Sequence, residues 1–515
     1  MQESAVPNRA GNVKQTSLLL SRCANATAKE KKQNGHPTNT PYNISGLSAV
    51  PMKSPSAKER GRSVVLTKPD FDVAIIGGGP AGSSMGAYLA KAGVSCVVFE
   101  RELFPRPHVG ESLVPSSTRV FRDLDFLPQM EEAKFPHKFG AVWTADDKQK
   151  NPYQLGWEGL APDCHADIRF DEREQVGVDK NYTYHVDRGK FDLMLLQHAN
   201  RLGAAVYEGV KVSAVDFGPK EPVVRFAMGR NAKEMAVSAK MVVDASGRNT
   251  FLGNQLKLKV QDTVFDQYAI HSWFDHYDRR VFSKKDDHRD YIFIHFLPIS
   301  NTWIWQIPIT STVTSLGVVT QKKNFAKSKS DREKFFWESV ASRPMLEETL
   351  RKADRVRPFK DEGDYSYAMK QLCGDRFVLV GDAGRFVDPI FSTGVSIALN
   401  SSRFAHRDIL AALGKNDFSR ESFSSFENTL RVGTKNWYDF ITVYYRLNVL
   451  FTYFINDPKC RLDVLKLLQG DVYDDAAPPV LQQMRTMVAE VEQNENHPWH
   501  KMLGDLTANA FRPEF

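Results

Sequence analysis

The sequence predicts an α/β protein: a Rossmann-like domain interrupted by an antiparallel sheet and followed by a helical C-terminal region. Three observations support this prediction. Within residues 71–100 an apolar run, a glycine turn, a helical segment and a second apolar run follow one another. Residues 265–320 alternate with a period of two, which is typical of antiparallel strands. A short apolar run at 377–380 then resembles another strand of the first sheet.

The glycine turn of the first unit has the spacing GxGxxG, with Gly77, Gly79 and Gly82 directly after an apolar strand. In this arrangement Gly77 allows the tight turn, and Gly79 lets the backbone approach a pyrophosphate. Gly82 lets the helix pack closely against the strand. The amides at the start of the helix, near Ala81, attract phosphate oxygens. The spacing therefore predicts a bound dinucleotide.

The second strand of this unit, Cys96–Phe99, ends in Glu100. A carboxylate at this position can accept hydrogen bonds from ribose hydroxyls, which favours FAD or NAD over NADP. A glycine-rich turn in another kind of α/β unit could show the same spacing. The preceding strand, the following helix and the acid together favour the dinucleotide.

Three regions are predicted from the sequence pattern: an extension over residues 1–68, a nucleotide-binding module over 69–415 and a helical region over 416–515 that covers the substrate site. The extension is basic, polar and poor in large apolar residues. This composition fits both a disordered tail and an organelle-targeting segment. We therefore expect a cytoplasmic protein, or an organellar one if the extension is a transit peptide.

Charge and cysteine usage exclude several classes of protein. Residues 1–62 hold ten Lys or Arg and three acidic residues, so the rest of the chain carries about −1 of the formal +6. This near-neutral remainder gives no indication of nucleic-acid binding. Five scattered cysteines without a CxxC pair predict neither a metal site nor a disulfide framework. The most apolar stretch, 437–455, contains charged residues, so we expect no transmembrane segment.

Three motifs in this order resemble the FAD-dependent aromatic hydroxylase-like superfamily: GxGxxG, the DASG segment at 244–247 and the GDA segment at 381–383. The resemblance implies that FAD is the cofactor. It also implies that Asp382 contacts the flavin and that Arg188 lies near it.

Two further motifs narrow the resemblance to the flavin-dependent halogenases, in the branch that acts on phenols and pyrroles. Residues 303–308 read WIWQIP and match the WxWxIP signature, and Lys138 in KFGA matches the position of a catalytic lysine. The loop at 388–395 resembles the family segment that holds halide, here with Thr393 and Gly394. Some enzymes of this branch act on substrates tethered to a carrier protein.

The resemblance implies a reaction in which the flavin supplies oxidation. Reduced FAD and oxygen form a hydroperoxide, and chloride or bromide attacks it to give hypohalous acid. Lys138 would then carry the halogen to an electron-rich ring, either as an ammonium that donates a hydrogen bond or as an amine that forms a haloamine. Trp303 and Trp305 lie on one face of a strand and would keep the substrate away from the flavin.

The main alternative is an aromatic monooxygenase of the same fold, which would hydroxylate its substrate directly. A non-catalytic flavoprotein that binds a carrier protein is a third possibility. No second GxGxxG occurs in the chain, so we expect a separate flavin reductase. Glu111, in the loop after the first unit, fits equally a base, a residue that orders the flavin and a turn cap. The predicted function is halogenation in natural-product biosynthesis.

Overall fold

The fold is that of a computed structural model, which describes most of the chain. Most of the extension predicted for residues 1–68 lies outside the described residues. The described residues are 68–145, 165–229, 233–262, 264–283, 285, 288, 290–363, 366–473 and 477–506.

The first sheet is the predicted Rossmann-like sheet. Strands β1 (Phe71–Ile76) and β2 (Cys96–Glu100) are parallel neighbours, and β10 (Met235–Asp244) pairs with the other edge of β1. Strand β20 (Phe377–Leu379) joins beyond β10, also in parallel. The full order is β19-β20-β10-β1-β2-β7, with β8 (Val210–Asp216) and β9 (Val223–Met228) attached through β10. The two outer strands of this order are β19 (Cys373–Gly374) and β7 (Ala205–Glu208). The DASG and GDA motifs, far apart in sequence, thus end neighbouring strands.

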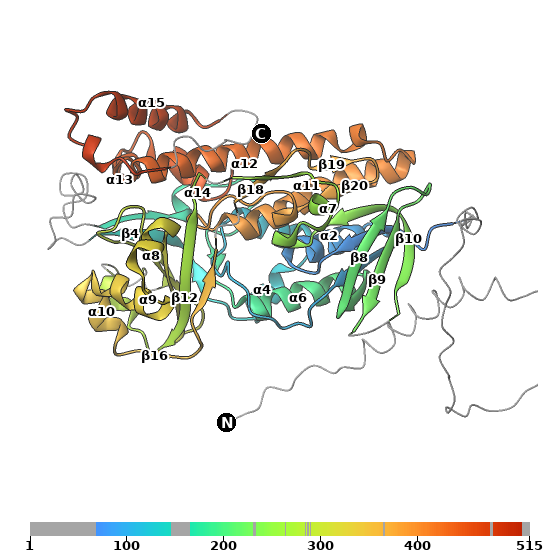
Figure 1. The fold of residues 1–515 in the computed structure, drawn as a ribbon, viewed down its shortest axis with the longest axis horizontal. Helices are drawn as coiled ribbons and strands as arrows, with labels where there is room; N and C mark the ends of the chain where they lie inside the picture. Colours follow the sequence, from blue (N-terminus) through green and yellow to red (C-terminus); the bar gives the residue numbers. More distant parts are fainter. Residues whose placement is uncertain are drawn as a thin grey trace, which may run out of the picture.

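Helix α2 (Pro80–Lys91) is buried along nearly its whole length, because it packs between α6 (Arg188–Arg201) and α11 (Thr393–Lys415). Its small residues allow this close packing, since a Cβ at Gly86 would already contact Val98 on the sheet. Figure 1 shows these helices beside the first sheet, on the right of the molecule. The N-termini of α2 and α11 therefore approach the same region.

The second sheet corresponds to the predicted antiparallel insertion but is larger. Its core is β12 (Gln267–Asp275), β13 (Ile292–Phe296), β14 (Trp303–Pro308) and β15 (Thr314–Gln321). Beyond residues 265–320 it takes in β4 (Gly140–Thr144) and β5 (His165–Arg169) on one side. On the other side it takes in β16 (Asp354–Arg355) and β17 (Lys360–Glu362). The β13–β4 pair is parallel, so the sheet is mixed at that point. Local alternation could not show this, because the partner strand precedes the insertion by more than a hundred residues.

The two faces of the second sheet have different partners, as alternation along the strands requires. Ile304, Leu316 and Val318 pack with helices α9 (Arg332–Ala341) and α10 (Pro344–Leu350) in a separate hydrophobic cluster. Side chains of the opposite face belong to the main core, which they share with the first sheet. That face includes both tryptophans of the WxWxIP segment.

The C-terminal region is helical, as predicted. Helix α12 (Ser424–Arg446) packs along α11, and the shorter α13 (Asn448–Asn456), α14 (Arg461–Leu468) and α15 (Pro479–Gln493) follow. In Figure 1 these helices lie along the top of the molecule. The apolar stretch 437–455 is divided between α12 and α13. Within the described residues, no helix is both long and apolar enough to cross a membrane.

Candidate active site

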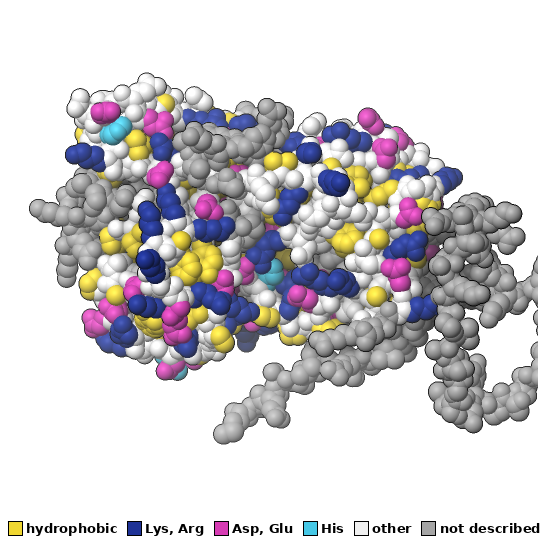
Figure 2. All heavy atoms as spheres, in the orientation of Figure 1, with side chains coloured by type: hydrophobic (Ala, Val, Ile, Leu, Met, Phe, Trp, Pro, Cys, Tyr) yellow, Lys and Arg dark blue, Asp and Glu magenta, His cyan; other side chains and the backbone are white. Residues whose placement is uncertain are grey.

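A cavity of about 670 Å³ lies between the two sheets. It is lined by the glycine turn, the loop after β2, the DASG and GDA segments, the loop before α11 and strands β13 and β14. Figure 2 shows Lys and Arg side chains gathered near the middle of this face, between the two parts of the molecule. Four arginines line the cavity: Arg101, Arg106, Arg188 and Arg248. Such a lining suits an anionic ligand.

The glycine turn forms one end of this cavity. A Cβ at Gly82 would come within 1.8 Å of the Gly77 carbonyl oxygen, and Gly77 itself has a φ of +102°. Gly79 is the N-cap of α2 and has no side-chain cap, so the first amides of this helix are available to a ligand. A Cβ at Gly79 would meet only Arg106 within 4 Å. The turn thus fits a pyrophosphate, as predicted from its spacing.

Glu100 lines the same end and is nearly buried. Its Oε2 accepts a hydrogen bond from the Gly78 amide at 2.7 Å, and its Oε1 accepts one from the Glu102 amide at 2.8 Å. A carboxylate has about four acceptor positions, so two stay available for ribose hydroxyls. Glu100 therefore shapes the glycine turn as well as fitting the predicted ribose contact.

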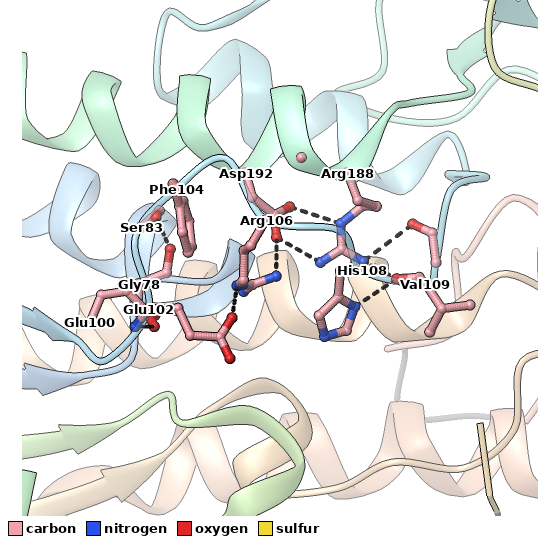
Figure 3. Close-up of polar contacts among 12 residues, drawn as sticks. Gly78, Ser83, Glu100, Glu102, Phe104, Arg106, His108, Val109, Arg188 and Asp192 are labelled. Carbon is pink, nitrogen blue, oxygen red and sulfur yellow. Dashed lines mark hydrogen bonds and ion pairs between the residues drawn. The ribbon is translucent and has the colours of Figure 1, made fainter. Parts of the chain in front are cut away.

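Asp192 on α6 joins two arginines beside the glycine turn (Figure 3). It accepts two hydrogen bonds from Arg188, at 2.8 and 3.0 Å, and one from Arg106 Nη1 at 3.3 Å. Arg188 also donates to the carbonyls of Val109 and Gly110. Arg188 thus lines the cavity, and its contacts within the protein hold the loop after β2; its proximity to the flavin stays a prediction.

Arg106 was not identified from the sequence. Its guanidinium also pairs with Glu102 Oε2 at 3.1 Å (Figure 3), and its Nη2 lies 3.6 Å from the position of a Cβ at Gly79, the uncapped start of α2. That placement suits a pyrophosphate ligand, because Nη2 is a charged donor beside the amides of the helix start. The only sequence signal was an arginine between two prolines in a loop that follows the nucleotide-binding unit.

Asp382 follows β20 and lines the cavity. Its carbonyl accepts the Tyr367 hydroxyl, whereas its carboxylate makes no hydrogen bond with the described residues. Burial raises the pKa of this carboxyl to about 6, against the opposing charges of Arg248 and Arg188. A carboxylate without hydrogen bonds beside the cavity fits the hydroxyls of a ribityl chain. The lining as a whole therefore fits FAD.

The loop before α11 forms the adjoining wall. Thr393 and Gly394 are the first two residues of this 23-residue helix, and both line the cavity. The N-cap, Ser392, has a left-handed φ of +59° and makes no side-chain cap bond. An uncapped helix N-terminus attracts an anion, which fits the predicted halide position.

The two tryptophans of β14 line the cavity on the side of the second sheet, opposite the first sheet, which carries the glycine turn. Their ring centroids are 6.2 Å apart, and both side chains are buried. Trp305 Nε1 donates to Ser315 Oγ at 3.1 Å, and Trp303 Nε1 donates to the Tyr445 hydroxyl at 3.3 Å. Both indoles are therefore held in fixed orientations, as a wall requires.

Glu111 is buried and lines the cavity. Its Oε1 accepts hydrogen bonds from Trp273 Nε1 at 2.6 Å and from Arg357 Nη2 at 3.0 Å, and Ser315 bonds it as well. Burial raises the pKa of this carboxyl, and its hydrogen bonds and Arg357 oppose the rise. These contacts give Glu111 a role outside the three that the sequence left open, because it connects the loop after β2 to the second sheet.

Lys138 lies on β3 (His137–Lys138) and does not line the cavity. Its Nζ donates to the Leu113 carbonyl at 2.8 Å and lies 5.7 Å from the centre of the Phe170 ring. The side chain is buried, and desolvation lowers its pKa to about 7. Leu113 follows Glu111 by two residues, so the lysine stands just behind the segment that borders the cavity.

His185 lies near Lys138, and sequence reasoning missed it. Its ring is buried, and Nε2 bonds the Asp290 carbonyl at 2.9 Å. Burial, followed by the charge of Lys138, lowers the pKa of this imidazole well below its usual value. His185 is therefore neutral at physiological pH.

Comparison with known proteins identifies the family to which the chain belongs. A family model described as tryptophan halogenase matches residues 72–158 and 141–454. The chain belongs to the tryptophan halogenase family. It is a flavin-dependent halogenase, with FAD as cofactor and halide as cosubstrate. The alternatives of a monooxygenase and of a non-catalytic flavoprotein are therefore set aside.

Two relatives cover most of the chain. The 1H-pyrrole-2-carbonyl-[peptidyl-carrier protein] chlorinase of Pseudomonas fluorescens is 56% identical over 87% of this chain and 99% of its own length. The corresponding brominase of Pseudoalteromonas luteoviolacea is 31% identical over 78% of this chain and 93% of its length.

Solved structures agree with this assignment. The flavin-dependent brominase Bmp2 superposes with a TM-score of 0.70 at 27% identity, covering 82% of this chain and 99% of the other. The halogenase PltM in complex with phloroglucinol and FAD has a TM-score of 0.67 at 18% identity, covering 84% and 94%. At 18% identity the second likeness concerns the fold alone.

Proposed function

We propose that this halogenase chlorinates a pyrrole ring held as an acyl group on a carrier protein, in the biosynthesis of a natural product. The relative that acts on a pyrrole-2-carbonyl carrier protein is 56% identical and matches along 99% of its length, which supports this substrate. The identity with the brominase is much lower, at 31%, and we therefore favour chloride over bromide.

The position of Lys138 is the observation that carries the proposed mechanism. The large cavity fits the cofactor, and Lys138 lies outside it, behind the segment 111–113. An oxidant made in the cavity must therefore leave it before it meets the lysine. That separation suits halogenation, because a substrate kept from the flavin receives halogen and not oxygen directly.

Different residues act in the cavity and at Lys138. Bound reduced FAD, with oxygen, supplies the two-electron oxidation that converts chloride into hypochlorous acid. The amides of Thr393 and Gly394 would hold chloride beside the cavity, and Trp303 and Trp305 would exclude the ring from it. The Lys138 ammonium would donate a hydrogen bond to the oxygen of hypochlorous acid. The ring then takes chlorine as the Cl–O bond breaks, and the oxygen leaves as water once the ring proton is lost.

We also propose that a separate flavin reductase supplies the reduced cofactor. One dinucleotide motif occurs in the sequence, and the residues around it line the cavity that fits FAD. No second GxGxxG is present to bind NADH.

The test is a reconstituted reaction with purified protein, FAD, a flavin reductase, NADH, oxygen and chloride. Pyrrole-2-carbonyl thioester on a carrier protein and free pyrrole-2-carboxylate are offered in parallel, and products are measured by mass spectrometry. We expect chlorine on the carrier-bound ring only. Chlorination of the free acid at an equal rate would overturn the tethered substrate, and a hydroxylated product would overturn the proposed reaction.

A further inference from the structure

We propose that Tyr445 on α12 is a positioning residue for halide: its hydroxyl fixes the loop before α11 and the Trp303 wall at the same time. The proposal rests on the proposed function, because it assigns that loop to halide. It concerns a residue of the C-terminal region, which contains none of the halogenase motifs described above.

The Tyr445 hydroxyl is both a donor and an acceptor. It donates to Asp388 Oδ1 at 3.0 Å and accepts from Trp303 Nε1 at 3.3 Å. All three side chains are buried, with exposed fractions of 1% for Asp388, 2% for Tyr445 and 3% for Trp303. Water cannot readily replace a bond lost at such a position, so its loss costs more than that of an exposed one.

Asp388 transmits this contact to the loop. Its Oδ1 also accepts the Ile390 amide at 2.9 Å, and its carbonyl accepts the Thr393 hydroxyl at 3.1 Å. Between these two bonds the chain passes through Ser392, whose φ is +59°. A non-glycine residue holds this left-handed conformation only where its surroundings fix it. Asp388 therefore sets the direction in which the Thr393 and Gly394 amides face.

The same hydroxyl orients the wall. Trp303 lines the cavity, and its indole N–H has Tyr445 as its acceptor. One phenol thus joins three segments that are distant in sequence: β14, the loop at 388–394 and α12. Burial, followed by the charge of Asp388, raises the pKa of Tyr445 well above its usual value, so the group stays a phenol and keeps its donor.

The proposal predicts a defect in halide use without a defect in cofactor binding. In Tyr445→Phe the ring packing is kept, while Asp388 loses a donor and Trp303 loses its acceptor. We expect the KM for chloride to rise about 5- to 10-fold, the factor that corresponds to one buried hydrogen bond. The Kd for FAD should stay within about twofold, because Tyr445 does not line the cavity.

The experiment measures chloride KM and kcat for each variant, and separately the quenching of FAD fluorescence by chloride in the loaded protein without turnover. Tyr473→Phe is the matched control, since its buried hydroxyl has no hydrogen-bond partner among the described residues. Its chloride KM should equal that of the wild type. If Tyr445→Phe does not fold, Trp303→Phe removes the indole donor and should raise the KM about two- to threefold.

An unchanged chloride KM in Tyr445→Phe, or an equal rise in Tyr473→Phe, would overturn the positioning role. The fluorescence titration keeps the two proposals apart. If the wild-type protein forms no chlorinated product, the proposed function fails. Weaker chloride quenching in Tyr445→Phe would still support the positioning role, and identical quenching would overturn it.

Discussion

The two ends of the large cavity are built from different chemistry. At the nucleotide end, the glycine turn, Glu100 and Arg106 present amides, a carboxylate and a guanidinium. At the other end, Trp303 and Trp305 present indoles whose only polar groups are already bonded within the protein. The first end offers hydrogen bonds to a ligand, and the second offers a closed apolar surface. The end that suits a nucleotide is thus separate from the apolar wall, and Lys138 lies outside the cavity, behind the segment 111–113.

Replacement of Lys138 is the strongest way to break this comparison, because it should abolish halogenation and leave the nucleotide end intact. In Lys138→Ala we expect product formation to fall by about 10³-fold, the size of removing a group that acts on the reacting atom. Oxygen uptake by the reduced, FAD-loaded protein should continue. Product mass and an oxygen electrode measure the two quantities.

Lys190→Ala is the matched control for this variant. Lys190 is also a lysine whose Nζ donates to a backbone carbonyl, that of Ala133 at 2.8 Å, but it is exposed on the surface. Its removal should leave product formation unchanged. Loss of FAD binding in Lys138→Ala would show a structural role and contradict the assignment.

Arg106→Ala tests the nucleotide end alone. The guanidinium faces the uncapped start of α2, where we expect the pyrophosphate. Loss of one hydrogen bond to a charged group corresponds to about a 10- to 100-fold rise in the FAD Kd. Fluorescence titration measures it. Arg122→Ala, at an exposed ion pair with Asp179, should leave this Kd unchanged, and equal Kd values for both variants would contradict the role of Arg106.

The pH dependence of the wild-type enzyme tests which form of Lys138, outside the cavity, acts on hypochlorous acid. Burial lowers the pKa of Lys138 to about 7, so the ammonium is the main form below this value and the amine above it. If the ammonium activates hypochlorous acid, kcat falls as pH rises through 7, by about tenfold between pH 6 and pH 8. A rise over the same interval would identify the neutral amine. Single-turnover rates of product formation do not depend on the reductase, so they measure the pH dependence of the halogenase alone.

Sequence reasoning was most complete where function depends on neighbours in the chain. One βαβ unit contains Gly77, Gly79, Gly82 and Glu100, so their spacing in the sequence determines how they lie relative to one another. Thr393 and Gly394 were reached through a motif, and they do stand at a helix start facing the cavity.

The contacts that sequence could not supply join distant segments. Asp192 meets Arg106 across 86 positions, Tyr445 meets Trp303 across 142, and Glu111 meets Trp273 across 162. No local period or motif predicts such pairs, because they depend on how the two sheets face each other. The mixed β13–β4 pairing was missed for the same reason.

Glu111 connects the loop after β2 to the second sheet, and its replacement should have the smallest effect. Its acceptor oxygen binds Trp273 and Arg357, while burial opposes its charge, as the raised pKa shows. Glu111→Gln keeps an acceptor and removes the charge, so we expect the free energy of unfolding to change by less than about 1 kcal/mol. Glu111→Ala leaves the half-buried indole N–H of Trp273 without its acceptor and should cost about 1–2 kcal/mol.

The pH dependence gives the sign of the charge effect. A carboxyl whose pKa is higher in the folded state contributes stability at low pH, and that stability is lost as pH rises from the unfolded value to the folded one. The wild-type protein should therefore lose stability relative to Glu111→Gln as pH rises above about 4.3, the usual value for a glutamate. Urea unfolding of both proteins at pH 4.5 and pH 7.5 measures this difference. A gain of wild-type stability relative to the variant would show that the pairing with Arg357 outweighs burial. The charge of Glu111 would then stabilise the contact between the loop after β2 and the second sheet.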